Sequence, residues 1–335
     1  MVAAKGCAAM LLSQILLDSG PAVVMRRGVK GGARVVPGAG SIHALAQEAL
    51  AQGVGLASIV EARDGGEAVD LVAMAREGRM LLPVSHPDLA HMHLTGTGLT
   101  HLGSASTRAS MHSDVQEATD SMKMFRLGIE GGKPAELPGV QPEWFWKGTG
   151  ANAVPPGAPL VSPAFALDGG EEPEIAGIYI IAPDGMPARI GWALANEFSD
   201  HAMERINYLY LAHSKIRPCS FGPEILVGEL PDHVEGTSRI RRAGQVIWEK
   251  PFLSGEANMS HSFANLEHHH FKYPLFRQPG DLHVHMFGTA TLSVGDGVVT
   301  QSGDVFEIEA APFGLPLVNP LEVAADEGVA RVRAL

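Results

Sequence analysis

Short apolar runs, rich in β-branched and aromatic residues and separated by turn residues, fill the chain from Trp144 to Leu321. Runs of this kind and length are typical of β-strands rather than of helices. One segment, residues 256–272, has helical character and is bounded by Gly255 and by a proline at position 274. The pattern therefore predicts a β-dominated core of mixed strands that one helix interrupts. The clearest predicted strands are residues 175–182, 188–195, 224–230, 245–250, 282–294 and 304–311.

The N-terminal part of the chain has a different pattern. Residues 41–52 have helical spacing with Ser41 placed to cap the helix, and residues 67–77 have the same character. Residues 83–112 are rich in loop-forming residues, and an amphipathic helix is predicted for residues 113–130. The expected fold class is therefore α+β and β-dominated. Its three predicted parts are a small α/β domain (1–95), a loop and helix connection that carries active-site residues (96–143), and the β core (144–335).

Composition and charge limit the functional class. The chain has 335 residues, 45% of them hydrophobic and 19% charged, which is typical of a globular protein with a large core. A formal net charge of −12 argues against nucleic acid as a partner, because binding phosphates requires clustered Lys and Arg. Cys7 and Cys219 are the only cysteines, which indicates a reducing compartment. No apolar run is long enough to span a membrane, and no signal-peptide layout begins the chain, so we expect a cytoplasmic protein.

Three acidic residues form the strongest chemical pattern. Glu172 and Glu174 flank one position of a predicted strand and therefore point to the same face, and Glu197 lies at the end of the next predicted strand. Three carboxylates that converge would suit a hard cation such as Mg²⁺, with Mn²⁺ or Ca²⁺ as alternatives. Glu-x-Glu is also common on solvated faces, so the spacing leaves both interpretations open.

Lysines and histidines provide further candidates. Lys147 follows three bulky residues, and Lys215 has a similar setting; each is either a buried lysine that meets an anion or a surface lysine with a buried stem. His268, His269 and His270 are consecutive in a predicted helix and cannot converge on one ion. For the two histidines at 283 and 285, which alternate along a predicted strand, we expect a packed or hydrogen-bonded role.

Five motifs, taken together and in order, carry a resemblance to a known family. They are EPEIAGIYII, GWALANEFSDH, SFGPEILVG preceded by Lys215, RQPGDLHVHMFGTATLS and SGDVFEIEAAPFGLPLVNPL. In this order they resemble the fumarylacetoacetate hydrolase-like family, over roughly residues 140–322. The segments LTGTGLTHLGSAST and SGEANMSHSFANLEHHHFKY resemble its sugar-acid branch, the 2-keto-3-deoxypentonate (arabonate or xylonate) dehydratases. The resemblance implies a mixed β-roll core with a smaller N-terminal α/β domain, and a homodimer.

The resemblance also implies roles for individual residues. Glu172, Glu174 and Glu197 match the metal triad of the family, although the family commonly has aspartate where this chain has Glu197. Lys215 matches a lysine beside the metal and substrate.

Substrate contacts and the base are implied in the same way. Gly288 and Thr289 match a Gly-Thr loop that contacts the substrate carboxylate. His112 is the best match for the family's histidine base, with Lys147 and Lys215 as rivals, and Lys147 is also a candidate for substrate binding.

The implied activity is metal-dependent dehydration of a 2-keto-3-deoxy sugar acid, either L-arabonate or D-xylonate, to 2-oxoglutarate semialdehyde through a metal-stabilised enolate. No cofactor beyond the metal is expected. Two alternatives remain open at this point. One is carbon–carbon hydrolysis of a 2,4-dioxo acid with release of pyruvate. The other is a non-catalytic protein that binds 2-oxo acids.

Overall fold

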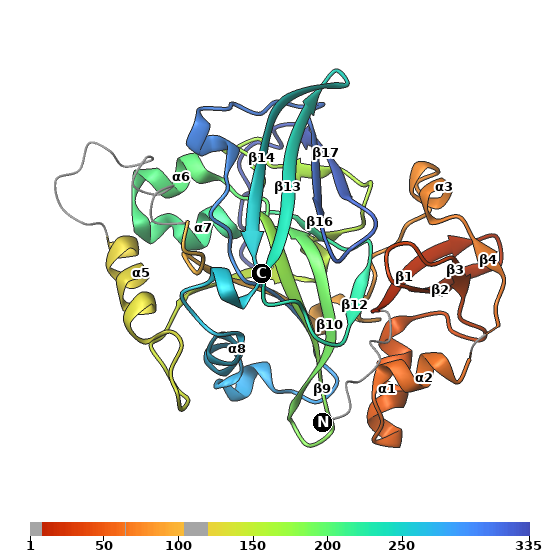
Figure 1. Ribbon diagram of the computed structural model, residues 1–335. Coiled ribbons are helices and arrows are strands. Elements are labelled where there is room, and N and C mark those ends of the chain that lie inside the picture. Colours follow the sequence, from red (N-terminus) through yellow and green to blue (C-terminus); the bar gives the residue numbers. More distant parts are fainter. Residues whose placement is uncertain (1–8, 64, 104–119) are drawn as a thin grey trace.

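The computed structural model describes residues 9–63, 65–103 and 120–335, and its architecture is β-dominated, as the sequence predicts (Figure 1). The strands form two mixed sheets. The larger sheet contains β1 (Met10–Leu17), β2 (Gly20–Arg27), β3 (Ala33–Val35), β4 (Ala68–Val69), β5 (Met92–Gly98), β6 (Glu143–Thr149), β7 (Ala153–Val154), β9 (Pro173–Ile181), β10 (Pro187–Asn196), β11 (Cys219–Phe221), β12 (Ile225–Val227) and β15 (Leu282–Met286). The smaller sheet contains β8 (Leu160–Ser162), β13 (Val234–Arg242), β14 (Gln245–Ser254), β16 (Val305–Ala310) and β17 (Leu317–Val323).

The strand order brings distant parts of the chain together. In the larger sheet the order is β4-β3-β2-β1-β12-β10-β9-β15-β5-β6, with β11 paired to β10 and to β7; in the smaller sheet it is β14-β13-β16-β17-β8. Most pairs are antiparallel, and the parallel pairs are β5 with β15, β7 with β11 and β8 with β17. Strands β9 and β10 form a long hairpin at the centre of the larger sheet. Every residue of β9 is buried, so its side chains contribute to the core on both faces of the sheet.

Short helices surround the sheets. The α-helices are α1 (Ile42–Gln52), α2 (Leu56–Glu61), α3 (Leu71–Arg76), α5 (Asp120–Gly131), α6 (His201–Ile206), α7 (Leu211–Lys215) and α8 (Phe263–Phe271), and the 3₁₀ turns are η1 (Leu89–His91), η2 (Gly150–Asn152), η3 (Tyr208–Tyr210), η4 (Glu256–Asn258), η5 (Pro274–Phe276) and η6 (Ser293–Asp296). In Figure 1, α1 to α3 lie at one side of the molecule with β1 to β4, and α5 to α7 lie at the opposite side. Among the described residues, no helix is long and apolar enough to cross a membrane.

The hydrophobic core has two main parts. The larger part lies on one face of the large sheet, where residues of α1 and α2 such as Ile42 and Val60 pack with residues of β9 and β15 such as Ile178 and Val284. The second part joins the two sheets and includes Trp192 of β10. Side chains alternate between the two faces along each strand, so the parity of a residue decides which core it enters.

The N-terminal segment is continuous with the large sheet. Strand β1 pairs with β12 on one side and with β2 on the other, so the first strands extend the central sheet. The domain boundary expected at residue 95 lies within β5. Strand β5 falls in a segment that the sequence predicts to be loop, and its Thr and Gly residues explain why its strand character is weak in the sequence.

Several predicted boundaries change in the structure. Helix α1 follows its prediction, because Ser41 accepts a hydrogen bond from the Ala44 N–H. The helix predicted over 67–77 starts only at residue 71, because Asp70 caps it and the preceding residues pair with β3. The helix predicted over 256–272 is divided into η4 and α8, and Ser262 caps α8. The strand predicted over 282–294 ends at Met286, two residues before a glycine with positive φ.

Candidate metal centre

The three glutamates meet at one end of the β9–β10 hairpin. Glu174 lies near the start of β9 opposite Ala195 of β10, and Glu172 and Glu197 lie just outside the two strands. The Glu197 N–H donates to the Glu172 carbonyl over 3.1 Å, which continues the pairing beyond the hairpin. Antiparallel register thus brings two glutamates from one segment beside one from the next. Each offers a carboxylate oxygen, these oxygens lie within 4.8 Å of one another, and all three residues are buried.

Two buried lysines complete the charge pattern. The Lys215 ammonium, at the end of α7, lies 2.5 Å from Glu172 Oε1 and 2.6 Å from Glu197 Oε2. The Lys147 ammonium, on β6, lies 2.5 Å from Glu197 Oε1 and also donates to the carbonyls of Phe198 (2.6 Å) and Lys215 (2.9 Å). Both lysines are buried and contact carboxylates. Of the two interpretations left open by the sequence, the structure supports the buried lysine that meets an anion. All three protons of the Lys147 ammonium therefore have partners within the protein.

The electrostatics distinguish the three carboxyl groups. Burial raises the pKa of Glu172, but Lys215 and His201 outweigh burial and hold it well below its usual range. Burial, together with the negative charges of Glu197 and Glu172, raises the pKa of Glu174 well above its usual range. The pKa of Glu197 is raised by burial and by Glu172, against the opposing effect of the lysines. Glu174 is thus the carboxyl group on which burial and negative neighbours most clearly outweigh the charge of Lys215.

This set of donors fits a hard divalent cation. The ligand atoms are carboxylate oxygens only. Mg²⁺, Mn²⁺ and Ca²⁺ prefer such oxygen ligands, whereas softer metals prefer thiolates. A cation would also offset the negative charges around Glu174. Gly288 completes this side of the site, because its N–H donates to Glu174 Oε2 over 2.7 Å and fixes the carboxylate.

Gly288 of the Gly-Thr pair lies next to Glu174. Gly288 has φ of +84°, and a Cβ at this position would come within 2.6 Å of Thr100 Oγ1 and 2.7 Å of the Thr97 carbonyl oxygen. Thr289 is buried, and its hydroxyl accepts a hydrogen bond from the Thr291 N–H. The predicted base, His112, lies outside the described residues.

Sequence reasoning missed a histidine beside the glutamates. His201 Nε2 lies 3.1 Å from Glu172 Oε1, and its Nδ1 lies 3.7 Å from a carboxylate oxygen of Asp168. Burial lowers the pKa of His201, but the nearby carboxylates of Asp168 and Glu172 outweigh it and raise the pKa to about 10. The imidazole is therefore protonated at neutral pH and orients Glu172. Its position four residues after Glu197 was the only sequence signal.

Two further buried carboxyl groups were also missed. Glu171 accepts hydrogen bonds from the N–H and the hydroxyl of Ser293. Glu143 is buried on β6, and the burial pattern of this strand, in which residues 143, 145 and 147 are buried, places it on the same side as Lys147. The side chain of Glu143 lies over Gly98, where a Cβ would come within 2.1 Å of Glu143 Oε1. No metal-binding spacing marks either residue in the sequence.

Comparison with known proteins gives a fold but no family model. No protein-family model matches the chain, and no curated protein matches it. Solved structures do match, among them a 2-keto-3-deoxy-D-arabinonate dehydratase in its apo form, with a TM-score of 0.69 and 19% identity over 95% of this chain and 100% of that chain. The same enzyme complexed with magnesium and 2,5-dioxopentanoate matches with a TM-score of 0.68 and 18% identity, over 95% of this chain and 100% of that one.

A second group of matching structures consists of isomerases. A 5-carboxymethyl-2-hydroxymuconate delta-isomerase from Mycobacterium smegmatis matches with a TM-score of 0.55 and 16% identity, over 94% of this chain and 100% of that chain. Likeness at these identities shows the fold. The fold resemblance to fumarylacetoacetate hydrolase-like proteins and to sugar-acid dehydratases, predicted from the five motifs, is thereby confirmed.

Proposed function

We propose that this chain, which has the fold of the solved sugar-acid dehydratases, is a metal-dependent hydro-lyase. Its proposed substrate is 2-keto-3-deoxy-L-arabonate or 2-keto-3-deoxy-D-xylonate, and its product is 2-oxoglutarate semialdehyde. The observation that carries the proposal is the buried set of three carboxylates with the Lys215 ammonium among them. Such a site combines a place for a hard cation with a fixed positive charge beside it.

The three glutamates would hold the cation, with Mg²⁺ as the first choice. When bound, a divalent cation polarises a 2-oxo group and makes the neighbouring C3 protons more acidic. The residues of the chain keep the three carboxylates in place for this role. His201 orients Glu172, Lys147 orients Glu197, and the Gly288 N–H orients Glu174.

Lys215 is best suited to stabilise charge. Burial lowers its pKa, but Glu172 and Glu197 outweigh burial and raise the pKa above its usual value. A lysine in this state keeps its proton, so it can stabilise negative charge that develops on the substrate but is a poor base. Its ammonium also lies 4.9 Å from the centre of the Phe145 ring, which helps to fix its position.

The base that removes the C3 proton is a separate proposal. Lys147 uses its three protons within the protein and meets a carboxylate, so it too is a poor base. His112 remains the base that the family resemblance favours. Glu143 is a rival from the described part of the chain, because it is a buried carboxyl group on the face of β6 that carries Lys147. Comparing the pH profiles of kcat in His112→Gln and Glu143→Gln distinguishes the two, since only loss of the base removes the acidic limb.

Docking of the substrate carboxylate is proposed for Gly288 and Thr289. They lie beside the glutamates, and Gly288 is already tied to Glu174. We expect Thr289→Val to raise KM for the 2-oxo acid. A fall in kcat alone would instead place the hydroxyl's role in the transition state. The homodimer expected from the resemblance is likewise a proposal, which sedimentation analysis tests.

The deciding experiment uses purified protein with Mg²⁺ and each of the two sugar acids. Formation of semialdehyde is followed with an NADP-linked dehydrogenase, with and without EDTA. Semialdehyde that disappears with chelator and in Glu174→Gln supports the proposal. Pyruvate released from a 2,4-dioxo acid, without semialdehyde from either sugar acid, would assign the chain to carbon–carbon hydrolysis. Tight binding of 2-oxo acids with no product would favour a binding protein.

A further inference from the structure

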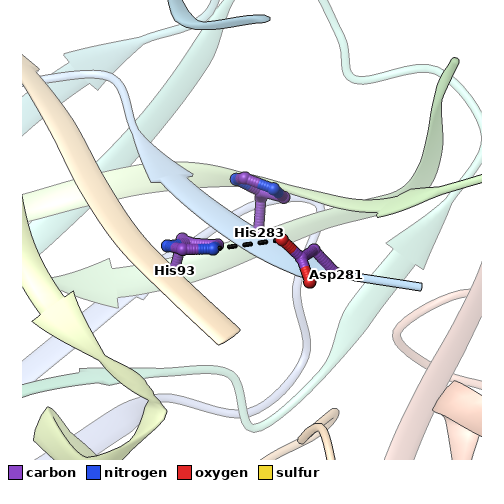
Figure 2. Close-up of side chains that lie close together, drawn as sticks. All are labelled: His93, Asp281 and His283. Carbon is purple, nitrogen blue, oxygen red and sulfur yellow. Dashed lines mark hydrogen bonds and ion pairs between the residues drawn. The ribbon is translucent and has the colours of Figure 1, made fainter. Parts of the chain in front are cut away.

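A second group of potential metal ligands lies on the opposite face of the large sheet. His93 of β5 and His283 of β15 are directly paired in the parallel register, so their side chains project from the same face. Glu174 has the parity of the residues that enter the α1 core, whereas His283 pairs with Tyr179 and faces α8. Asp281 precedes β15 and points toward both histidines (Figure 2). The group is thus separated from the three glutamates by the sheet itself.

The geometry of this group approaches that of a metal site. One ligand atom from each of the three residues lies within 4.8 Å of the others. The distance from His93 Nε2 to Asp281 Oδ2 is 3.3 Å, close to the edge of about 3.3 Å in a tetrahedron with metal bonds of about 2.0–2.1 Å. Asp281 and His283 are buried, and the side chain of His93 is 17% exposed.

A histidine nitrogen supplies a second, independent observation. Nε2 of His283 is buried and has no hydrogen-bond partner among the described residues. A buried polar atom without a partner is costly, so such atoms often mark a missing ligand. Burial, and next the charge of His270, lower the pKa of His283 well below its usual value, so its imidazole is neutral and needs only a change of tautomer to offer Nε2 to an ion.

We propose that His93, Asp281 and His283 bind a divalent transition-metal ion of the Zn²⁺ class. Two imidazoles and one carboxylate suit such an ion better than they suit Mg²⁺. The neighbouring residues already occupy supporting positions. His91 Nδ1 lies 2.7 Å from Asp281 Oδ1, which leaves Oδ2 for the ion, and His270 Nε2 lies 3.0 Å from His283 Nδ1. Such partners of the other ring nitrogen or oxygen orient metal ligands. His91 is half exposed, so an ion can enter from that side.

Trp144 opposes binding of the ion, because its indole N–H fixes which ring nitrogens of His270 and His283 carry a proton. Its indole N–H donates to His270 Nδ1 over 3.2 Å, so neutral His270 carries its proton on Nε2 and donates it to His283 Nδ1. His283 then carries its own proton on Nε2, where the ion would bind. Binding moves that proton to Nδ1, reverses the hydrogen bond between the two histidines and leaves the indole without an acceptor. Trp144→Phe should therefore bind the ion more tightly than the unaltered protein.

The test is a titration of metal-stripped protein with Co²⁺ in a large excess of Mg²⁺, which fills the glutamate site. The visible absorption of Co²⁺ bound to nitrogen and oxygen reports the second site, and Zn²⁺ should displace it. We expect one equivalent to bind. His283→Gln and Asp281→Asn should weaken binding at least about tenfold, and Trp144→Phe should tighten it several-fold. His285→Gln is the matched control, because this buried histidine lies on the same face of β15 but outside the ligand set.

Several results would overturn the proposal. These are absence of saturable Co²⁺ binding, binding that persists in His283→Gln, or binding that is lost in Glu174→Gln. If circular dichroism shows that His283→Gln does not fold, His93→Gln decides, because that side chain is partly exposed and its loss should disturb the core less. Unchanged or weaker binding in Trp144→Phe would refute the tautomer step. None of these readouts depends on turnover. The proposed metal site can therefore be confirmed or refuted independently of the proposed hydro-lyase activity.

Discussion

The Lys215 ammonium occupies a position between Glu172 and Glu197 that a divalent cation would also favour. Two positive charges would repel each other in a buried site, so under the proposed function the lysine would lower the affinity for metal while it supplies charge to the reaction. Lys215→Met should therefore bind Mg²⁺ more tightly than the unaltered protein and should turn over substrate at least about 100-fold more slowly.

Isothermal titration with Mg²⁺ and steady-state kinetics separate the two effects of Lys215→Met. Lys250→Met is a control, because this lysine forms an ion pair with Asp296 on the half-exposed surface of β14. Weaker Mg²⁺ binding in Lys215→Met would show that the lysine supports the metal site rather than competing with the ion.

Glu171 predicts a dependence of stability on pH. Burial raises the pKa of Glu171 to about 7 from its usual value of 4.5, although hydrogen bonds from Ser293 act in the opposite direction. The folded state therefore binds more protons than the unfolded state between these two pH values, and the free energy of unfolding falls as pH rises through this window. A shift of this size corresponds to about 3 kcal/mol lost by pH 8.

Glu171→Gln should remove this dependence. The glutamine carbonyl can accept from the Ser293 N–H, and its amide can donate to the Ser293 hydroxyl, so the local hydrogen bonds are kept. The variant should be more stable than the unaltered protein at pH 8 and about equal at pH 5. Urea unfolding at the two pH values measures this, and parallel pH profiles for both proteins would contradict the assignment.

At the scale of elements, the turn after β15 helps to form the candidate metal site. Gly288 adopts φ of +84°, where a side chain is strained, and a Cβ would meet Thr100 Oγ1 at 2.6 Å. Gly288→Ala should shift the N–H away from Glu174 and weaken Mg²⁺ binding about tenfold, since hydrogen bonds to charged groups are worth about 1.5–3 kcal/mol. Thr289→Val is the matched control, and its Mg²⁺ affinity should not change. Equal affinities in both variants, measured by titration calorimetry, would refute the role of this turn.

Local signals explain which elements could be predicted. Helix α1 was predictable because its cap and its apolar period lie within its own sequence. Strand β5 was not, because its Thr and Gly residues carry little strand preference and only its pairing with β15 and β6 stabilises it. The segment 256–272 has helical composition throughout, but Ser262 accepts a hydrogen bond from the Asn265 N–H and starts a new helix there. Caps of this kind decide boundaries that composition leaves open.

The same distinction applies to the candidate site. The glutamates were predictable because strand alternation and hairpin register place them together. The contacts of His201 with Glu172, and of Lys147 with the Lys215 carbonyl, depend on how α6, α7 and β6 pack after the sheet has formed. Sequence spacing does not describe such contacts, so the convergence of the three glutamates could be predicted and the residues that contact them could not.

At the scale of the whole molecule, one buried carboxylate joins three parts of the chain. Glu224, which precedes β12, accepts hydrogen bonds from Arg26 of β2 over 2.6 and 2.7 Å. It also accepts from the N–H groups of Gly314 (2.8 Å) and Leu315 (3.0 Å), which connect β16 to β17 of the smaller sheet. The side chain of Glu224 is 1% exposed and that of Arg26 is 10% exposed. The N-terminal strands, the central sheet and the smaller sheet therefore depend on the same group.

Glu224→Ala should reduce the free energy of unfolding by about 3–5 kcal/mol, because it leaves the Arg26 guanidinium buried without its partner. Replacing both residues, as Arg26→Met with Glu224→Leu, should cost less, since no charge then remains unpaired. Glu48→Ala is the control: its ion pair with Arg63 is partly exposed and should contribute at most about 1 kcal/mol. Guanidinium unfolding of the four proteins measures these differences. If Glu224→Ala were no less stable than Glu48→Ala, the buried pair would be neutral for folding, and the N-terminal strands would be held by β1–β12 pairing and apolar contacts alone.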